Sequence, residues 1–267
     1  MTTAKQNIVF VLVPGSFSPS SFYDKTIPLL EAKGYDTYPT DLKSANDGTR
    51  PVVSMYEDAE EINKIINRLA DEGKDVILVC NSYGGIPSTE GTKGTSRAER
   101  MSCGRSGGLI GIVYLSAFVA RIGQCVRDIM GARMPEQEVS SNGYMSMDPE
   151  AAVNFIFAHL GPEDRTLYGR RFRNHCARTF SDGLTYPGYM KVPSTYVLCS
   201  DDPVIPPELQ NEMIKSALAQ DAEMVVQEIY SDHCPMVTHP EEVAKILIAV
   251  AEGDGKYTNK TQIDRFN

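Results

Sequence analysis

Apolar stretches of strand length alternate along this chain with segments whose apolar residues recur at helical spacing. Residues 7–13 form a continuous apolar run that ends at Pro14-Gly15, and residues 55–72 carry one apolar stripe that ends at Gly73. Such alternation is typical of an α/β protein, with a mostly parallel sheet and helices on both of its faces. Strands are predicted at residues 7–13, 35–39, 75–80, 109–116, 193–200 and 224–230, and helices at 22–33, 55–72, from 86 onward, 206–219 and 240–252.

The alternation is broken once, between Ser116 and Val192. This stretch shows only short helical patterns, at residues 149–160 and 164–175. An insertion at this point would lie over the carboxyl ends of the strands, where α/β proteins bind their ligands. We therefore predict a core made of residues 1–117 and 192–267 and a cap made of residues 118–191. A polar excursion at residues 88–108 and a loose polar tail at residues 253–267 are predicted outside these regular elements.

A serine follows the third predicted strand in a sequence that favours a sharp turn. The apolar run 76–80 is followed by Asn81-Ser82-Tyr83 and then by the small residues Gly84 and Gly85. A strand that ends in a strained turn with a serine at its tip is a nucleophile elbow, which exposes the hydroxyl at the edge of the sheet. An ordinary strand–helix turn has a similar composition, so the interpretation depends on partners for Ser82.

A nucleophilic serine needs a general base and an acid that orients this base, both supplied after an elbow by later loops. His233 stands directly after the last predicted strand, where such a base is needed, and a loop histidine without a role is the alternative interpretation. Asp201 and Asp202 both follow the preceding strand, and the residue types alone leave both open as the acid. The other histidines lie in the predicted cap or at the start of the last helix: His159, His175 and His239.

The tetrahedral intermediate of an acyl transfer needs two backbone N–H groups that point at its oxyanion. The N–H of Tyr83, the residue after the nucleophile, is one expected donor. The N–H of Ser16 is the other, because it lies in the loop after the first strand and the adjacent Gly15 lets this backbone approach closely. A simple turn at Pro14-Gly15 is the alternative interpretation.

Composition narrows the classes of function. The net charge of -9 argues against a nucleic-acid partner, since phosphate binding needs clustered Lys and Arg. No apolar stretch approaches the ~20 residues of a membrane span, and the N-terminal apolar run is too short for a secretory signal. The six cysteines form no C-x-x-C pair, so neither a metal nor a redox site is expected, and a cytoplasmic location is the default.

The motifs together resemble those of the α/β-hydrolase superfamily, and more narrowly the branch of plant methylesterases and hydroxynitrile lyases with their fungal relatives. The similarity rests on Pro14-Gly15-Ser16, on 81–85, on the acid loop 195–206 and on the segment from His233 to Val243, and it covers most of the chain. The excursion at 92–108 resembles one seen in fungal members. The resemblance implies the α/β-hydrolase fold, with a helical cap inserted after the sixth strand. It also selects Asp202 as the acid, because the aspartate of the family lies four residues before a proline, here Pro206.

This resemblance implies a cofactor-independent serine esterase or lactonase with Ser82, His233 and Asp202 as its triad, acting through an acyl-enzyme. The similar hydroxynitrile lyases have a lysine just after the catalytic histidine and a threonine in the first loop, where this chain has Cys234 and Gly15, so ester chemistry is favoured. Two alternatives stay open: a lyase, cyclase or acyltransferase on the same scaffold, and a ligand-binding protein with a vestigial triad. A small-molecule ester is the expected partner, and a homodimer stays open.

Residues of the predicted cap indicate the substrate class. Its aromatic and methionine side chains are candidates for an apolar or aromatic pocket, although most of them are expected to hold the cap together. The basic residues Arg165, Arg170, Arg171 and Arg173 are expected to form a solvated face paired with local acids, with the steering of an acidic substrate as the alternative. The apolar candidates are Met145, Met147, Phe155, Phe157, Phe172, Phe180, Tyr186, Tyr189 and Met190.

Overall fold

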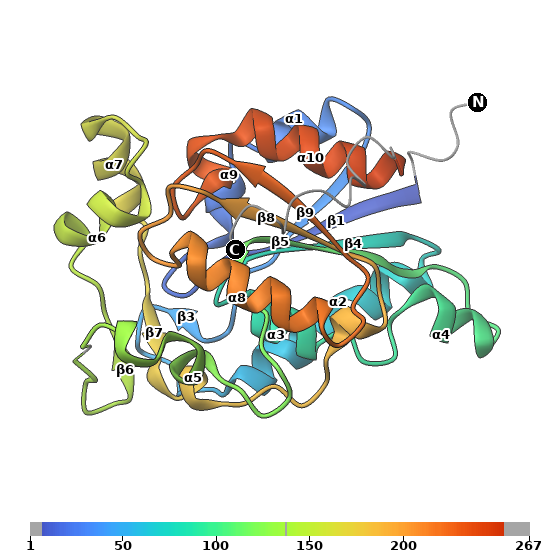
Figure 1. Ribbon diagram of the computed structural model, residues 1–267, viewed down its shortest axis with the longest axis horizontal. Coiled ribbons are helices and arrows are strands. Elements are labelled where there is room, and N and C mark those ends of the chain that lie inside the picture. The colour runs from blue at the N-terminus through green and yellow to red at the C-terminus, as the bar shows by residue number, and fades with distance from the viewer. Residues whose placement is uncertain (1–6, 137, 254–267) are drawn as a thin grey trace.

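The computed structural model describes residues 7–136 and 138–253, which form a six-stranded sheet between two layers of helices (Figure 1). All neighbouring strands of this sheet are parallel, in the order β2-β1-β4-β5-β8-β9. The predicted tail at 253–267 lies, apart from Gly253, outside the described residues. The strands are β1 (Ile8–Val13), β2 (Asp36–Pro39), β4 (Asp75–Ser82), β5 (Gly108–Ala117), β8 (Ser194–Cys199) and β9 (Met224–Ile229).

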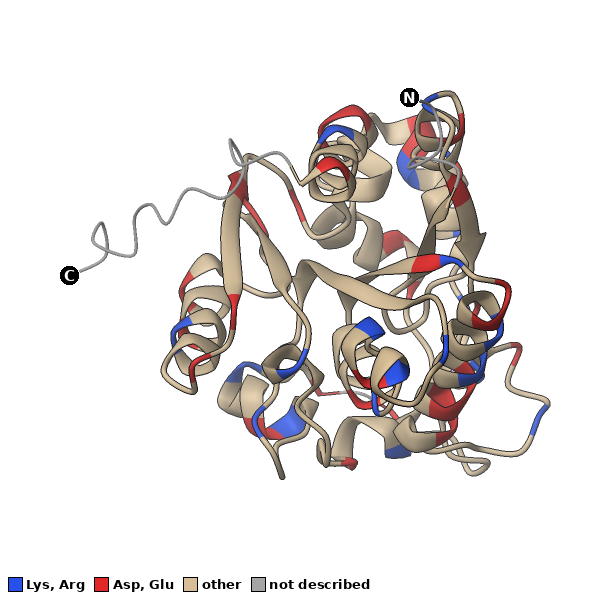
Figure 2. Cartoon of the chain, turned by 90° about the vertical axis from the view of Figure 1, so that its right-hand side faces the viewer, with Lys and Arg blue, Asp and Glu red and all other residues tan. Residues whose placement is uncertain are grey.

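The central strands are largely apolar because helices cover both faces of the sheet. Every residue of β1 and of β8 is buried. Charged residues gather instead on the helices and loops around the sheet (Figure 2). All six predicted strands are present, with ends that differ by at most two residues, so the predicted α/β fold class is confirmed.

Helices of the C-terminal and N-terminal segments meet on one face of the sheet, and the remaining long helices lie on the other (Figure 1). The longest, α2, begins at a capping box formed by Ser54 and Glu57 and ends before Gly73, whose φ of +85° suits glycine. One face carries α1 (Ile27–Glu31) and α10 (Pro240–Glu252); the other carries α2 (Met55–Asp71), α3 (Gly85–Glu90) and α8 (Pro207–Leu218).

Three predicted helices are shorter than expected, and one of them, predicted at 149–160, ends at Ile156 as α6 (Pro149–Ile156). The helix predicted at 22–33 divides into a short 3-10 helix, η2 (Ser20–Tyr23), and α1, because Pro28 fits only the first turn of a new helix. The helix predicted at 164–175 ends early, as α7 (Pro162–Gly169). Its predicted last turn forms the strand β7 (Asn174–Cys176) instead, since these residues find backbone partners in two distant strands.

The polar excursion at 88–108 is well packed rather than loose. It contains α4 (Arg97–Ser102), on which Arg100 is almost fully buried. The Arg100 guanidinium donates to Asp71 at 2.6 Å, to Asn67 at 2.8 Å and to the Gly107 carbonyl at 3.2 Å. These bonds join the excursion to the end of α2 and satisfy the buried cation.

The insertion begins after β5, at the position in the chain where the sequence predicted that the alternation breaks. It was expected after a sixth strand, but β5 is the fourth of the six described sheet strands along the chain, because the sheet starts directly with β1 and β2. The division into core and cap stays a prediction. The other described elements between residues 118 and 191 are α5 (Val126–Met130), η3 (Gly131–Arg133), β6 (Tyr144–Met145), α6 (Pro149–Ile156), η4 (Ala177–Ser181) and η5 (Gly188–Met190).

A second, three-stranded sheet joins this insertion to the segment before α2. Its order is β3-β7-β6, and β3 (Ala45–Asn46) comes from the loop after β2. Both pairings are antiparallel, with Ala45 opposite His175 and Met145 opposite His175 on the other side. In the described part of the chain, no helix is both long and apolar enough to cross a bilayer.

Candidate active site

The turn after β4 has the strained geometry of an elbow. Ser82 has a φ of +52°, a conformation that costs a residue with a side chain on the order of 1–3 kcal/mol. The small residues beyond it are required by space: a Cβ on Gly84 would lie 2.4 Å from the Pro14 carbonyl oxygen, and a Cβ on Gly85 would lie 2.3 Å from that of Phe118. The sequence predicted a sharp turn followed by small residues, and the structure adds the close backbone contacts that require them.

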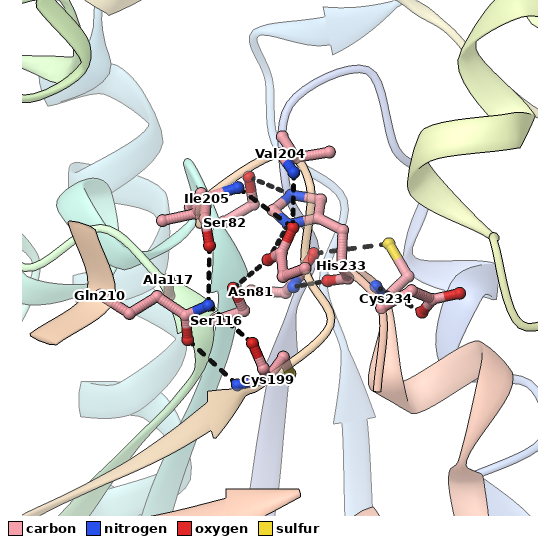
Figure 3. A network of polar contacts seen from close by, with 12 residues as sticks. Asn81, Ser82, Ser116, Ala117, Cys199, Val204, Ile205, Gln210, His233 and Cys234 are labelled. Atoms are coloured by element: carbon pink, nitrogen blue, oxygen red, sulfur yellow. Dashed lines mark hydrogen bonds and ion pairs between the residues drawn. The ribbon is translucent and has the colours of Figure 1, made fainter. Parts of the chain in front are cut away.

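Ser82 and His233 lie within hydrogen-bonding distance of each other. The Nε2 atom of His233 is 2.9 Å from the Ser82 hydroxyl oxygen (Figure 3). The Nδ1 atom of His233 is 2.7 Å from Oδ2 of Asp202. All three side chains are buried, and Asp202 is only 2 % exposed. The loops after β4, β8 and β9 thus bring together the three residues that the sequence placed there.

The two candidate aspartates differ in where their side chains lie. Asp202 points at His233, whereas Asp201 is half exposed and binds the cap histidine His159, 2.8 Å from its Nε2. The free oxygen of Asp202 accepts the backbone N–H groups of Val204 at 2.7 Å and of Ile205 at 3.0 Å. These donors fix the carboxylate in one orientation.

Two side chains that sequence reasoning missed complete this network (Figure 3). Ser116, at the end of β5 with a φ of +38°, donates its hydroxyl to Oδ2 of Asp202. Asn81 donates to the carbonyl oxygens of Leu115 at 2.8 Å and of His233 at 3.0 Å. In the sequence, the two residues are marked only by their positions near the ends of strands. Such positions are too common to predict these contacts.

The loop after β1 touches the elbow, as its predicted role requires. A Cβ on Gly15 would lie 2.8 Å from the Cβ of Ser82 and 3.4 Å from its hydroxyl oxygen, so only glycine allows this approach. Ser16 lines the cavity in front of Ser82. Among the described residues, the N–H groups of Ser16 and Tyr83 donate to no other protein group, so both are free to bind an oxyanion.

The remaining histidines have partners away from the serine. The backbone N–H of His159 donates to Asp232 at 2.9 Å, and His239 contacts the hydroxyl of Thr238 at 3.0 Å. His175 is fully buried, and this burial lowers its pKa to about 3. None of the three is within hydrogen-bonding reach of Ser82 in the described structure.

A cavity of about 360 Å³ opens in front of Ser82 and His233. Of the cap residues predicted as candidates, Met147, Phe155 and Phe180 line it. Phe157, Tyr189 and most of the others are packed in the two hydrophobic cores instead, as the sequence indicated for the majority. The apolar wall consists of Phe17, Phe118, Val126, Met130, Met134, Pro135, Met147, Ala152, Phe155, Ile156, Phe180 and Val204.

The basic residues near α7 are engaged with local groups. Arg171 binds Asp24 at 2.5 Å and Arg173 binds Asp41 at 2.8 Å. Arg165 donates to the carbonyl oxygens of Phe157 and Leu160 at 3.1 and 2.9 Å. Arg171 and Arg173 therefore follow the expectation of pairing with local acids, whereas Arg165 binds backbone carbonyl oxygens instead. Within the described ranges, no cluster of His, Cys, Asp and Glu has the arrangement of a metal site.

Comparison with known proteins agrees with this geometry. Residues 10–246 match the model of the Alpha/beta hydrolase family. The chain is 28% identical over 246 residues to the Probable hydrolase R7 of Phoma sp., covering 90% of this chain and 97% of that protein. It is 27% identical over 278 residues to Methylesterase 1 of Arabidopsis thaliana, covering 94% and 99% of the two chains.

Solved structures show the same fold. The pyrethroid hydrolase of Sphingobium faniae JZ-2 aligns with a TM-score of 0.73 at 20% sequence identity, over 94% of this chain and 100% of that one. The resemblance to methylesterases and fungal hydrolases that the motifs indicated is thereby confirmed. Since the family model spans nearly the whole described chain, this protein belongs to the alpha/beta hydrolase family.

Proposed function

We propose that this protein is a serine hydrolase that cleaves a small apolar or aromatic carboxylic ester or lactone through an acyl-enzyme. The observation that carries the proposal is the 2.9 Å distance between the Ser82 hydroxyl oxygen and Nε2 of His233 at the wall of a cavity. A serine without a base is a poor nucleophile, whereas one in contact with an oriented imidazole is activated. The names of two relatives, a methylesterase and a probable hydrolase, support the same class of reaction.

In the first half of the reaction, the Ser82 oxygen attacks the ester carbonyl carbon while its proton passes to Nε2 of His233. Asp202 accepts the Nδ1–H bond and stabilises the imidazolium that forms. The N–H groups of Ser16 and Tyr83 stabilise the negative oxygen of the tetrahedral intermediate. The intermediate collapses when Nε2–H gives its proton to the departing alcohol oxygen.

In the second half, water replaces the alcohol. His233 takes a proton from this water as its oxygen attacks the acyl carbon, and a second tetrahedral intermediate forms. Its collapse returns the proton to the Ser82 oxygen and releases the carboxylic acid. Every proton in this cycle is carried by Nε2 of His233, so the proposed chemistry uses side chains and water, without a cofactor or metal.

The cavity supports a small and mostly apolar substrate. Its volume of about 360 Å³ is near the lower end of the ~300–1,000 Å³ range of small-molecule sites. The insertion supplies Met130, Phe155 and Phe180 to the wall, so we infer that residues 118–191 act as a cap that selects the ester. Apart from Arg133 on the insertion, the polar side chains in the wall belong to the elbow, to the loop after β1 and to His233, which would orient the scissile carbonyl at the serine.

The residue after His233 favours ester cleavage over the release of an anion such as cyanide. Cys234 is fully buried, and burial raises its pKa well above the usual range of a thiol. It therefore offers neither a cation nor a thiolate to the leaving group. An alcohol leaving group needs only the proton that His233 carries.

The direct test is a panel of p-nitrophenyl and methyl esters hydrolysed by the wild type and by Ser82→Ala. The wild type is expected to be active and the variant to lose activity by several orders of magnitude. Ser88→Ala is a matched control, because Ser88 is equally buried on α3 and does not line the cavity. Turnover in ¹⁸O-labelled water should place label in the acid product, and an active enzyme that leaves the acid unlabelled would indicate a non-hydrolytic reaction instead.

A further inference from the structure

The side chain of Tyr83 points away from the cavity into a buried polar cluster behind the elbow. Its hydroxyl donates to Oδ2 of Asp58 on α2 at 2.9 Å. Asp58 is only 1 % exposed, and its carboxylate also accepts the backbone N–H of Ser44 at 3.0 Å and the Ser44 hydroxyl at 2.5 Å. The catalytic scheme above uses none of these side-chain contacts.

We propose that Asp58 is a positioning residue, which holds the Tyr83 phenol so that the Tyr83 backbone N–H stays aimed at the oxyanion. This inference rests on the proposed function, because it assigns a role to one of the two oxyanion donors. The geometry supports it in three steps: the strain at the elbow, the placement of the ring and the direction of the hydrogen bond.

The elbow needs restraints on both sides of Ser82 because its backbone is strained. On the strand side, Asn81 is held through its side chain by two carbonyl oxygens. On the helix side, the N–H of Gly84 donates to the Asn81 carbonyl at 2.9 Å. Between them, Tyr83 has a backbone N–H that donates to no described protein group, so its orientation depends on its neighbours and on its own side chain.

The Tyr83 ring is fixed by aromatic neighbours on the insertion. The ring of His175 packs against it edge-on at 4.8 Å between centroids, and that of Phe180 lies at 5.7 Å. These contacts set the plane of the ring, and the hydroxyl contact with Asp58 at 2.9 Å anchors the far end of the side chain. Because one residue carries both the ring and the oxyanion N–H, displacement of the phenol would rotate the donor.

The direction of the hydrogen bond is unambiguous. Burial raises the pKa of the Tyr83 phenol well above its usual range, so the phenol keeps its proton and donates. Burial raises the pKa of the Asp58 carboxyl to about 6, so the carboxyl is largely ionised at pH 8 and accepts. A hydrogen bond to an ionised acceptor in a buried site is stronger than a neutral one and holds its geometry better.

The experiment compares Tyr83→Phe with Tyr189→Phe at pH 8. Tyr189 is equally buried, and its hydroxyl donates to the Ala120 carbonyl at 3.1 Å, so both variants lose one buried phenol hydrogen bond. We expect kcat of Tyr83→Phe for a p-nitrophenyl ester to fall about 10-fold with KM changed less than about two-fold, because the lost restraint acts on transition-state binding. Tyr189→Phe should retain kcat within about two-fold.

A trifluoromethyl ketone gives a readout that a merely structural role would not move. The Ser82 oxygen adds to its carbonyl carbon, the proton passes to Nε2 of His233, and the ketone oxygen becomes an oxyanion in the same site. Its inhibition constant should rise with Tyr83→Phe by the same factor as kcat falls. Unchanged affinity for the ketone, or an equal fall of kcat in Tyr189→Phe, would overturn the assignment.

A double-mutant cycle with Asp58→Asn tests the link itself. In Asp58→Asn, the Ser44 N–H must face the amide oxygen, so the amide NH₂ takes the place of Oδ2. This NH₂ would donate to the Tyr83 hydroxyl, so the hydrogen bond is reversed and weaker. Tyr83→Phe should therefore cost less in this background than in the wild type, and strict additivity would contradict the proposal. A wild type that neither hydrolyses esters nor binds the ketone would overturn the proposed function and this inference together, whereas an active enzyme indifferent to Tyr83→Phe would overturn this inference alone.

Discussion

Asn81 donates from its side chain to the carbonyl oxygen of His233 at 3.0 Å, which joins the loop of the proposed nucleophile to the loop of the proposed base. The two residues are separated by 152 positions in the chain. The contact fixes the distance between the elbow and the imidazole independently of the bond between Ser82 and His233. In the proposed mechanism, this contact would hold the pair together when the proton moves between them.

Asn81→Ala should reduce both activity and stability. It leaves the carbonyl oxygens of Leu115 and His233 without their donor, which costs about 1–3 kcal/mol of unfolding free energy in a buried site. We expect kcat/KM for an ester to fall about 10- to 100-fold as the base loop loosens. Urea unfolding and ester kinetics measure the two effects.

Asn63→Ala is the control for this change. Asn63 also donates to two carbonyl oxygens, those of Gly91 at 2.8 Å and Lys93 at 2.9 Å, but it lies on α2 and does not line the cavity. Its loss should lower stability and leave kcat near the wild-type value. Equal kinetic effects of the two variants would contradict a specific role for Asn81.

The two aspartates of the acid loop should differ sharply in their effect on rate. Asp202→Asn places an amide against Nδ1 of His233 and favours the wrong tautomer, so kcat should fall on the order of 10⁴-fold. Asp201→Asn changes a half-exposed group that contacts His159, and kcat should stay within about three-fold. Stopped-flow ester hydrolysis distinguishes the two variants. A larger loss of kcat in Asp201→Asn than in Asp202→Asn would make Asp201 the acid that orients His233.

Gly15→Ala should close the space between the first loop and the nucleophile. The added Cβ would lie 2.8 Å from the Cβ of Ser82, so either the loop or the elbow must shift. A misplaced oxyanion donor costs about 3 kcal/mol of barrier, which predicts a kcat about 100-fold lower. Gly161→Ala is the control, because its new Cβ has no atom within 4 Å and the kinetics should stay unchanged. If Gly15→Ala is as active as this control, Ser16 is not an oxyanion donor.

His175 should make the fold sensitive to acid. Its pKa is lowered by burial to about 3 in the folded state, against 6.5 as the ordinary value, so the unfolded chain binds a proton that the folded protein excludes. The stability from the neutral imidazole is therefore present above pH 6.5 and is lost as pH falls from 6.5 towards 3, by at most about 1.4 kcal/mol per pH unit.

His175→Phe should remove this loss, because an aromatic ring suits a site bordered by Phe17, Tyr83 and Phe180. The measurement is the free energy of unfolding of both proteins between pH 7 and pH 4.5. As the pH falls, the free energy of unfolding of the variant is expected to rise relative to that of the wild type. If the unfolding free energies of the two proteins change with pH in the same way, His175 can take up a proton in the folded protein, and the prediction is wrong.

The sequence predicted what depends on local pattern. The six strands follow from continuous apolar runs, and Ser82 and His233 follow from their positions directly after two of these runs. The choice of Asp202 over Asp201 needed the family resemblance, because two adjacent aspartates in one loop have the same local sequence environment. They differ in the direction of their side chains, which only the structure shows.

What the sequence could not predict depends on tertiary contacts. His175 lies in a strand rather than a helix because it pairs with β3 and β6, which are distant in the chain. The Asp58–Tyr83 bond joins the middle of an amphipathic helix to a turn, and no periodicity marks it. Ser116 on β5 binds Asp202 in the loop after the neighbouring strand β8, and only the strand order brings the two together.

The three-stranded sheet has a consequence for how substrate enters. Ala45 and Asn46 pair with His175 and Asn174, so the end of the insertion is hydrogen-bonded to a segment that precedes the elbow. A flap-like swing of the whole insertion would break this ladder. Ester and product should instead exchange when exposed side chains that line the cavity rotate, such as Phe155, which is 57% exposed. Such rotations are as fast as those of surface rotamers and much faster than domain hinge motions.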